Sequence, residues 1–309
     1  MSSAAHIPSR RADAVLVAIT AFWGVTFVVV KDAVGLADPF TFLALRFGLG
    51  AALLTAVAWR GVRGGALLRA GAGLGMLLFV GFAAQTAGLQ FTTPSRSAFL
   101  TGLSVLLVPF LAIAFHRHRP PPASLVGVAL AVVGLWALAG ADRAPGAPPD
   151  LWKGDALTLL CALAFALHIT LIERMARVHP PAPLVAVQLG TVAVIALAAM
   201  AALGPRLVST PALWSAVLIT GAGGSAVALL LQAWAQARTT AVRAALVFAL
   251  EPVFAAAYSV ALGREELRLR EVGGGGLIVL GVLVSELGPA GWTGLVRLLG
   301  REGRGARGV

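Results

Sequence analysis

Charged residues are scarce in this chain. Only 12% of its 309 residues are charged, whereas 59% are apolar, and the mean hydropathy is +0.89. Because roughly a quarter of the residues in a soluble domain are charged, this composition excludes an ordinary soluble globular protein. It predicts an all-α polytopic membrane protein whose main partner is the lipid bilayer. At about 20 residues per span, the length allows roughly ten membrane-spanning helices.

Residues suited to catalysis or metal binding are also few. The single cysteine, Cys161, lies in an apolar segment, which excludes a disulfide framework and a cysteine-based metal site. Of the five histidines, only His168 lies deep in an apolar run. The sequence contains no H-E-x-x-H, G-x-S-x-G or G-x-x-x-x-G-K-[ST] pattern, and no cluster of His, Asp and Glu at metal-ligand spacing. We therefore expect no catalytic residue, metal, cofactor or ATP-driven step, and a membrane-embedded enzyme is the weaker alternative.

Basic residues are grouped between the apolar segments. The formal net charge is +11, but short basic groups between apolar runs follow the positive-inside rule, so nucleic acid is not expected as a partner. The apolar runs lie at about 14–33, 39–59, 71–90, 95–115, 123–141, 155–175, 183–203, 212–234, 241–262 and 272–288. Ten spans put both termini on one side, and the distribution of arginine predicts that this side is cytoplasmic. The basic loop 263–271 falls on the other side and counts against this orientation.

The chain also aligns with itself. Asp13 matches Asp155, and the segment 92–136 aligns without a gap with 239–283. Each copy then holds five helices, and an odd number makes the second copy enter the membrane the opposite way round, as in many secondary transporters. We therefore predict two inverted five-helix repeats and a basic cytoplasmic tail, at 13–141, 155–288 and 289–309.

Several motifs follow one another along the chain in a characteristic order. They are WGVTFVVVK (23–31), DPFTFLALRF (38–47), TTPSRSAFLTGLSVLLVPF (92–110), GDALTLLCALAFALHITLIER (154–174), LLLQAWAQARTTAVRAALVFALEPVFAA (229–256) and GREEL (263–267). Together they resemble the EamA-like ten-helix branch of the drug/metabolite transporter superfamily, over about residues 13 to 286. The resemblance implies a multi-pass carrier of the bacterial inner membrane, commonly an exporter of amino acids, other metabolites or drugs. The chain departs from the family at 116–119, which reads His-Arg-His-Arg where an Arg-Glu pair is usual.

A carrier needs a central cavity with a few polar groups among aromatic ones. The residues that we expect to bind substrate are Trp23, Thr26, Phe27, Gln85, Phe165, His168 and Gln232. The first three share a face of the first helix at helical spacing, and Phe165 and His168 are the repeat partners of Trp23 and Thr26. The two glutamines match each other, deep in the third helix of each repeat. The alternative is ordinary packing: aromatic contacts, a core histidine with a satisfied hydrogen bond, and interhelical or back-bonded polar groups.

Four charged residues are candidates for proton coupling or gating: Glu251, Arg46, Arg96 and Arg243. Glu251 lies in an apolar run and precedes Pro252, which disturbs the helix. It either binds protons during transport or forms a buried structural pair with Arg46. Its repeat partner is Ser104, so any acid site belongs to one half only, and the first half is expected to be less disturbed there.

The two remaining arginines, Arg96 and Arg243, open the fourth helix of each repeat. We expect one near each membrane face, where each either gates one mouth of the cavity against a carboxylate or extends its side chain to the interface.

The function that the sequence predicts is secondary active transport by alternating access. The protein is expected to export a small polar or amphipathic metabolite, amino acid or drug, with proton coupling through Glu251 as one hypothesis. A membrane sensor or interaction protein that transports nothing, and a channel, are the alternatives. The sequence leaves open the substrate, the direction of transport, the coupling ion and the oligomeric state.

Overall fold

The computed structural model describes residues 10–116, 120–139, 150–263, 269–270 and 272–285. The predicted tail 289–309, most of the loop 263–271 and three of the residues at 116–119 lie outside this part of the chain. Within it, helices account for nearly all regular structure. A single isolated β-bridge joins Ala37 to Leu207.

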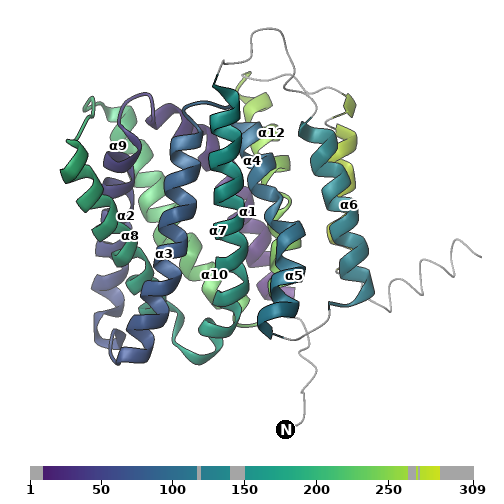
Figure 1. The fold of residues 1–309 in the computed structure, drawn as a ribbon, viewed down its shortest axis with the longest axis horizontal. Helices are drawn as coiled ribbons and strands as arrows, with labels where there is room; N and C mark the ends of the chain where they lie inside the picture. Colours follow the sequence, from purple (N-terminus) through teal and green to yellow (C-terminus); the bar gives the residue numbers. More distant parts are fainter. Residues whose placement is uncertain (1–9, 117–119, 140–149, 264–268, 271, 286–309) are drawn as a thin grey trace, which may run out of the picture.

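The helices are arranged as one bundle (Figure 1). Those of the first half are α1 (Arg10–Ala33), α2 (Pro39–Ala58), a short 3₁₀ turn (Trp59–Gly61), α3 (Gly65–Gly88), α4 (Pro94–Gly102), α5 (Ser104–His116) and α6 (Pro122–Ala139). Those of the second half are α7 (Leu151–Val178), α8 (Pro181–Leu203), α9 (Pro211–Leu218), a π-helical segment (Ile219–Val227), α10 (Ala228–Gln236), α11 (Ala241–Phe248), α12 (Glu251–Ala261) and a final helix, Val272–Ser285.

Eight helical stretches of the described chain are long and apolar enough to cross a membrane. They are Arg10–Ala33, Pro39–Gly61, Gly65–Gly88, Pro94–Phe115, Leu151–Val178, Pro181–Leu203, Pro211–Gln236 and Ala241–Ala261. The polytopic membrane fold is therefore confirmed. The fifth and tenth predicted spans correspond to shorter apolar helices, Pro122–Ala137 and Val272–Ser285, so the count of ten spans stays a prediction.

The fourth span of each half is broken at matching positions. In the first half α4 ends at Gly102 and α5 begins at Ser104; in the second half α11 ends at Phe248 and α12 begins at Glu251. The second break fits the sequence, because Pro252 lacks an amide proton and is tolerated only in the first turn of a helix. The first half was expected to be less disturbed, yet it is interrupted as well, with one residue between its two helices instead of two.

Small residues allow α3 to pack closely against α7 and α8. A Cβ atom on Gly81 would lie 2.3 Å from Cε1 of Phe165. A glycine at this point therefore lets the Phe165 ring lie directly against the α3 backbone. At one edge of the bundle, α6 packs on the helix Val272–Ser285 (Figure 1), and a Cβ on Gly127 would lie 2.5 Å from the carbonyl oxygen of Gly281.

The corner between α1 and α2 is fixed by Asp38. Its carboxylate caps α2 by accepting the amides of Phe40 and Thr41, and it also accepts the amide of Arg206 at the α8–α9 corner. Burial acts to raise the pKa of Asp38, but the hydrogen bonds from Thr41, Arg206 and Phe40 outweigh it and lower the pKa below its ordinary value. The ionised carboxylate thus ties the first half of the chain to the second.

Candidate functional site

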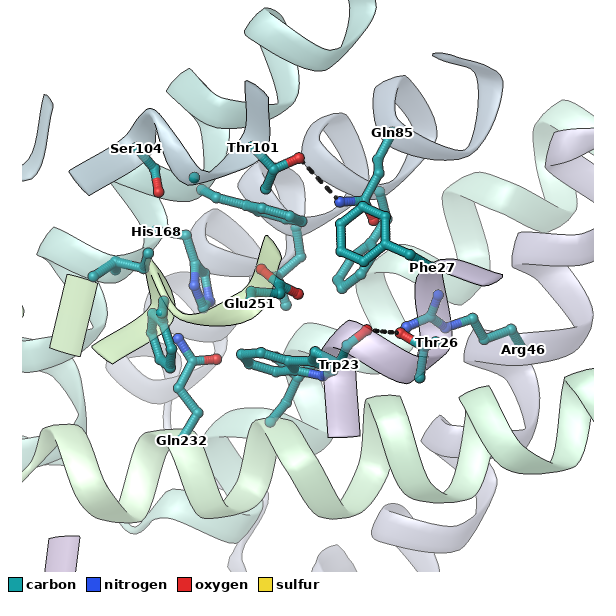
Figure 2. A pocket seen from close by; sticks show the side chains of 17 residues that line it. Trp23, Thr26, Phe27, Arg46, Gln85, Thr101, Ser104, His168, Gln232 and Glu251 are labelled. Atoms are coloured by element: carbon teal, nitrogen blue, oxygen red, sulfur yellow. Dashed lines mark hydrogen bonds between the residues drawn. The ribbon is translucent and has the colours of Figure 1, made fainter. Parts of the chain in front are cut away.

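A cavity lies between the two halves of the chain (Figure 2). It holds about 60 Å³ of space for the centres of water-sized molecules, which is room for several waters. All seven predicted substrate-binding residues line it, namely Trp23, Thr26, Phe27, Gln85, Phe165, His168 and Gln232. Arg46 and Glu251 line it too, whereas Arg96 and Arg243 do not.

Sequence reasoning missed part of the lining. The additional side chains include Phe82, Thr101 and Phe248. Each lies three residues before a residue already singled out: Gln85, Ser104 and Glu251, respectively. Helical periodicity could therefore have identified them, because residues three apart share a helix face.

The aromatic wall of the cavity is a chain of ring contacts. Trp23 packs on Phe248 with 5.5 Å between ring centroids, and Phe82 packs on Phe165 at 5.0 Å. The Trp23 indole Nε1 donates a hydrogen bond of 2.9 Å to the carbonyl oxygen of Gly224, which lies in the π-helical segment. The ring is thereby held in one orientation at the cavity.

Arg46 is almost fully buried, with 2% of its surface exposed. Its Nε donates to Ser225 Oγ at 2.9 Å, and its guanidinium lies over the rings of Phe82 and Phe47, 4.7 and 5.1 Å from their centroids. No carboxylate of the described chain forms an ion pair with it. Among the described residues, the buried positive charge is therefore compensated by one hydroxyl and two aromatic rings, and by no negative charge.

Glu251 is the first residue of α12, directly after the helix break. It lines the same cavity as Arg46, but the two do not form an ion pair, and no hydrogen bond to the Glu251 carboxylate is found among the described residues. The N-terminal end of a helix carries a partial positive charge, which favours an acidic group there. The structural pair with Arg46, one of the two interpretations of the sequence, is therefore not seen.

His168 and Thr26 are matching positions with different partners. The His168 ring Nε2 lies 2.8 Å from Oε1 of Gln188, and Gln188 is the repeat partner of Arg46. The Thr26 hydroxyl donates to the carbonyl oxygen of Trp23 at 2.8 Å, as expected for a threonine that bonds back to its own helix. The cation of Arg46 therefore lines the cavity in the first half, whereas its counterpart Gln188 does not line it and instead contacts the imidazole of His168, which does.

The two cavity glutamines, Gln85 and Gln232, differ in how they are satisfied. Gln85 Nε2 lies 3.4 Å from Thr101 Oγ1, a long hydrogen bond. Gln232 Nε2 donates to Gln236 at 2.8 Å, but its own Oε1 is buried without a hydrogen-bond partner. A buried acceptor without a partner carries an energetic penalty.

Arg96 and Arg243 form ion pairs that cross between the two halves. Arg96 binds Asp155 through two hydrogen bonds of 2.8 Å, and Arg243 Nη2 lies 3.1 Å from Asp13 Oδ2. Each pair joins the start of the fourth span of one half to the start of the first helix of the other. The self-alignment matched both arginines and both aspartates, but it did not identify them as partners.

Further contacts place these ion pairs at opposite ends of the molecule. Lys31, at the end of α1, donates to the carbonyl oxygens of Leu89 and Thr92 in the turn that leads to Arg96. Asp13 lies at the start of the same helix. Since the cavity residue Trp23 lies between Asp13 and Lys31 on α1, the cavity lies between the two ion pairs.

Comparisons with known proteins agree with this architecture. The model of the EamA-like transporter family matches residues 10–140 and again residues 152–287. An uncharacterized transporter of Archaeoglobus fulgidus is 30% identical over 276 residues, which covers 89% of this chain and 86% of the relative. The uncharacterized transporter YyaM of Bacillus subtilis is 25% identical over 281 residues, covering 88% and 92%, respectively.

A solved crystal structure shares the fold. It superposes with a TM-score of 0.73 at 22% identity, covering 90% of this chain and 98% of that chain. Two family matches that together span most of the sequence, and a relative at 30% identity over nearly its whole length, define the relationship. The chain therefore belongs to the EamA-like transporter family, and it is a multi-pass membrane transporter rather than an enzyme.

Proposed function

We propose that the protein is a secondary active transporter that works by alternating access and exports a small polar or amphipathic metabolite across the bacterial inner membrane. The observation that carries this proposal is one cavity lined by both halves of the chain, with an Arg–Asp ion pair toward each end. Alternating access requires a central site and a closure on either side of it. The names of the two relatives, both transporters, support it.

Contacts between helix ends support an inverted arrangement of the repeats. Arg243 reaches Asp13 at the start of α1, and Ala241, two residues earlier, donates its amide to Glu173 near the end of α7. The start of α1 and the end of α7 therefore share one end of the molecule. On this basis we propose ten spans, with α6 and Val272–Ser285 as the fifth and tenth, and both termini on the cytoplasmic side.

The two ion pairs are suited to act as gates. Arg96 and Asp155 have side chains 19% and 26% exposed, and Arg243 and Asp13 are each 15% exposed. Pairs that retain contact with solvent contribute modestly to stability and can open without leaving a fully buried charge. We propose that Arg96–Asp155 closes the outer mouth, that Arg243–Asp13 closes the cytoplasmic mouth, and that the two open in turn.

Glu251 is the proposed proton-binding group. Its carboxylate faces the cavity at a helix break, and the charged or titratable side chains that share the cavity are Arg46 and His168. Cys161 lies just beyond, 3.9 Å from Thr101. A carboxylate that is free of a fixed partner can exchange a proton with whichever side the cavity faces.

Flux measurements test the proposal. The purified protein in liposomes should exchange labelled substrate for unlabelled substrate across the membrane, with a rate that saturates as substrate concentration rises. Candidate substrates come from comparing secreted metabolites of cells with and without the protein. Saturable exchange that is absent from protein-free liposomes supports the proposal. Conductance without saturation, or no flux of any metabolite that the cells secrete in a protein-dependent way, would overturn it.

A further inference from the structure

We propose that Lys31 and the Glu173–Arg177 pair are positioning residues for the two proposed gates. Each binds the backbone of the turn that precedes one gate arginine and ties it to the first helix of its own half. These turns are the first corner, residues 89–93 between α3 and α4, and the second corner, residues 237–240 between α10 and α11. The inference rests on the proposed function, because it takes the two Arg–Asp pairs as gates.

In the first half, the corner is bound by Lys31, near the end of α1. Its ammonium group donates to the carbonyl oxygens of Leu89 at 2.6 Å and of Thr92 at 2.9 Å. The next residue, Thr93, caps α4 by accepting the amide of Arg96 through its hydroxyl. Hydrogen bonds from a charged donor are stronger than neutral ones. Lys31 therefore fixes the backbone directly before the cap of the helical turn that carries Arg96.

In the second half, two side chains of α7 bind the equivalent corner. Arg177 Nη2 donates to the carbonyl oxygen of Thr239 at 3.1 Å, and Thr239 is the repeat partner of Thr92. Glu173 Oε1 accepts from Arg177 at 2.8 Å, and Glu173 Oε2 accepts the amide of Ala241 at 2.7 Å. In each half, a cation on the first helix thus binds the same backbone carbonyl of the corner.

The use of a base in one half and an acid in the other matches a difference in one backbone amide. Glu173 is the repeat partner of Lys31. The first residue of α4 is Pro94, which has no amide proton, whereas the equivalent first residue of α11 is Ala241, which has one. A lysine, which only donates, suits a corner that presents carbonyl oxygens, but the amide of Ala241 needs an acceptor. Glu173 supplies that acceptor, and Arg177 supplies the cation.

These corner contacts lie within one half, whereas the gate pairs Arg96–Asp155 and Arg243–Asp13 join the two halves. The gate side chains are between 15% and 26% exposed, so water can solvate them when a pair separates. Separating Lys31 from its corner would instead leave two carbonyl oxygens without their donor. We therefore expect each corner to move with the first helix of its own half, so that a mouth opens between the ion-paired residues.

Thiol accessibility tests the inference at the first corner without a substrate. In a Cys161→Ala background, Ser104→Cys places a thiol on the cavity lining, and a membrane-impermeant maleimide is added to vesicles of either orientation. Lys31→Met removes the ammonium group, so labelling from outside should rise about tenfold, the effect of losing one hydrogen bond to a charged group. Labelling from inside should not rise. Lys31→Arg, which keeps a cationic donor, should behave like the parent protein.

At the second corner, Arg177→Ala should raise labelling from inside and not from outside. The arrangement of the first half can then be placed in the second. Glu173→Lys and Ala241→Pro, added to Arg177→Ala, supply a lysine and remove the amide that needs an acceptor. The triple variant should label from inside more slowly than Arg177→Ala alone and approach the parent protein. A merely structural role predicts the reverse, because the triple variant carries more substitutions.

Matched controls replace an exposed arginine near each proposed mouth. Arg206 lies at the α8–α9 corner, and its backbone amide and carbonyl, which Asp38 binds, remain in Arg206→Gln. Arg60 lies in the turn between α2 and α3. Arg206→Gln and Arg60→Gln should both label like the parent protein from either side.

The outcomes separate this inference from the proposed function. Increases confined to the expected sides, with rescue by the triple variant, support the inference. If Lys31→Met raises labelling equally from both sides or leaves it unchanged, while loss of the Arg96–Asp155 pair raises it from outside, the gate stands and the inference is wrong. A triple variant that labels no more slowly than Arg177→Ala also overturns it. If loss of neither ion pair changes labelling, the proposed gates fail, and the inference fails with them.

Discussion

The two halves of the molecule match at the ends of the cavity and differ at its centre. At the ends, Arg96–Asp155 and Arg243–Asp13 are equivalent pairs that cross between the halves. At the centre, Arg46 corresponds to Gln188, and Glu251 corresponds to Ser104. In the proposed mechanism, closing two mouths is the same task performed twice, so equivalent residues serve it. The centre is a single cavity, and each half contributes different groups to its lining.

The largest effect on transport is expected from substitution of Glu251, which lies at the helix break of the second half, compared with substitution of its counterpart Ser104 in the first half. Glu251→Gln should abolish the pH dependence of transport, with a fall of more than tenfold in flux driven by a proton gradient, because the neutral amide binds no proton. Ser104→Ala should retain most of the flux. The measurement is counterflow and gradient-driven flux in liposomes at several internal pH values. An unchanged pH profile in Glu251→Gln would exclude this residue as the coupling group.

Exchanging the two residues of one ion pair tests whether the equivalent pairs at the two ends of the cavity act as functional units. Arg96→Asp alone places two acids together and should reduce transport roughly tenfold, the size typical of coupling between sites. Combining it with Asp155→Arg should restore much of the activity, and the same exchange at Arg243 and Asp13 should behave alike. A double variant no better than the single one would argue against the pair as a functional unit.

The test becomes sharper when the side of the membrane from which the cavity can be reached is measured. In a Cys161→Ala background, Ser104→Cys reports access to the cavity through reaction with a membrane-impermeant thiol reagent. Loss of the Arg96–Asp155 pair should increase labelling from outside, and loss of Arg243–Asp13 should increase it from inside. Equal labelling from the same side in both variants would contradict gates at opposite mouths.

A smaller effect is expected where α3 approaches Phe165. Gly81→Ala places a methyl group where only 2.3 Å separates it from the ring, so it should destabilise the protein by about 1–3 kcal/mol. Gly73→Ala, in the same helix with open space around it, should be neutral or slightly stabilising. Thermal unfolding in detergent measures both. Equal melting temperatures for the two variants would show that Phe165 moves aside freely.

The smallest effect on stability is expected at Asp38, whose side chain caps α2. The equivalent residue before α8 is Pro180, which makes no side-chain cap. Asp38→Ala should lower stability by about 1 kcal/mol. Because folding lowers the pKa of Asp38, its contribution is present above the unfolded pKa and is lost as pH falls through the folded pKa. Melting curves at acidic pH should therefore converge for the two proteins. A constant difference across this range would mean that the carboxylate charge is not what stabilises the corner.

Much of this arrangement follows from sequence periodicity. Trp23, Thr26 and Phe27 share a helix face, and the structure places all three on the cavity. The helix break before Pro252 was signalled by the proline, whereas no proline adjoins the break before Ser104. The ion pair between Arg96 and Asp155 could not be predicted from the sequence. Self-alignment identifies residues that occupy equivalent positions in the two repeats, but not residues of different repeats that come into contact.

The π-helical segment has a consequence for how this protein tolerates insertions and deletions. Ile219–Val227 presents the Gly224 carbonyl to Trp23 and the Ser225 hydroxyl to Arg46, whereas α3 in the first half is a regular α-helix. A wide turn accommodates one extra residue per turn. Deleting one residue from this segment is therefore expected to convert a wide turn into a regular α-helical turn and to leave the residues beyond it, Gln232 included, on the cavity. In α3 no wide turn can absorb the loss, so the same deletion before Gln85 would rotate everything beyond it by about 100°. A frame-preserving deletion of one codon would then be tolerated in one half and would move a cavity residue in the other.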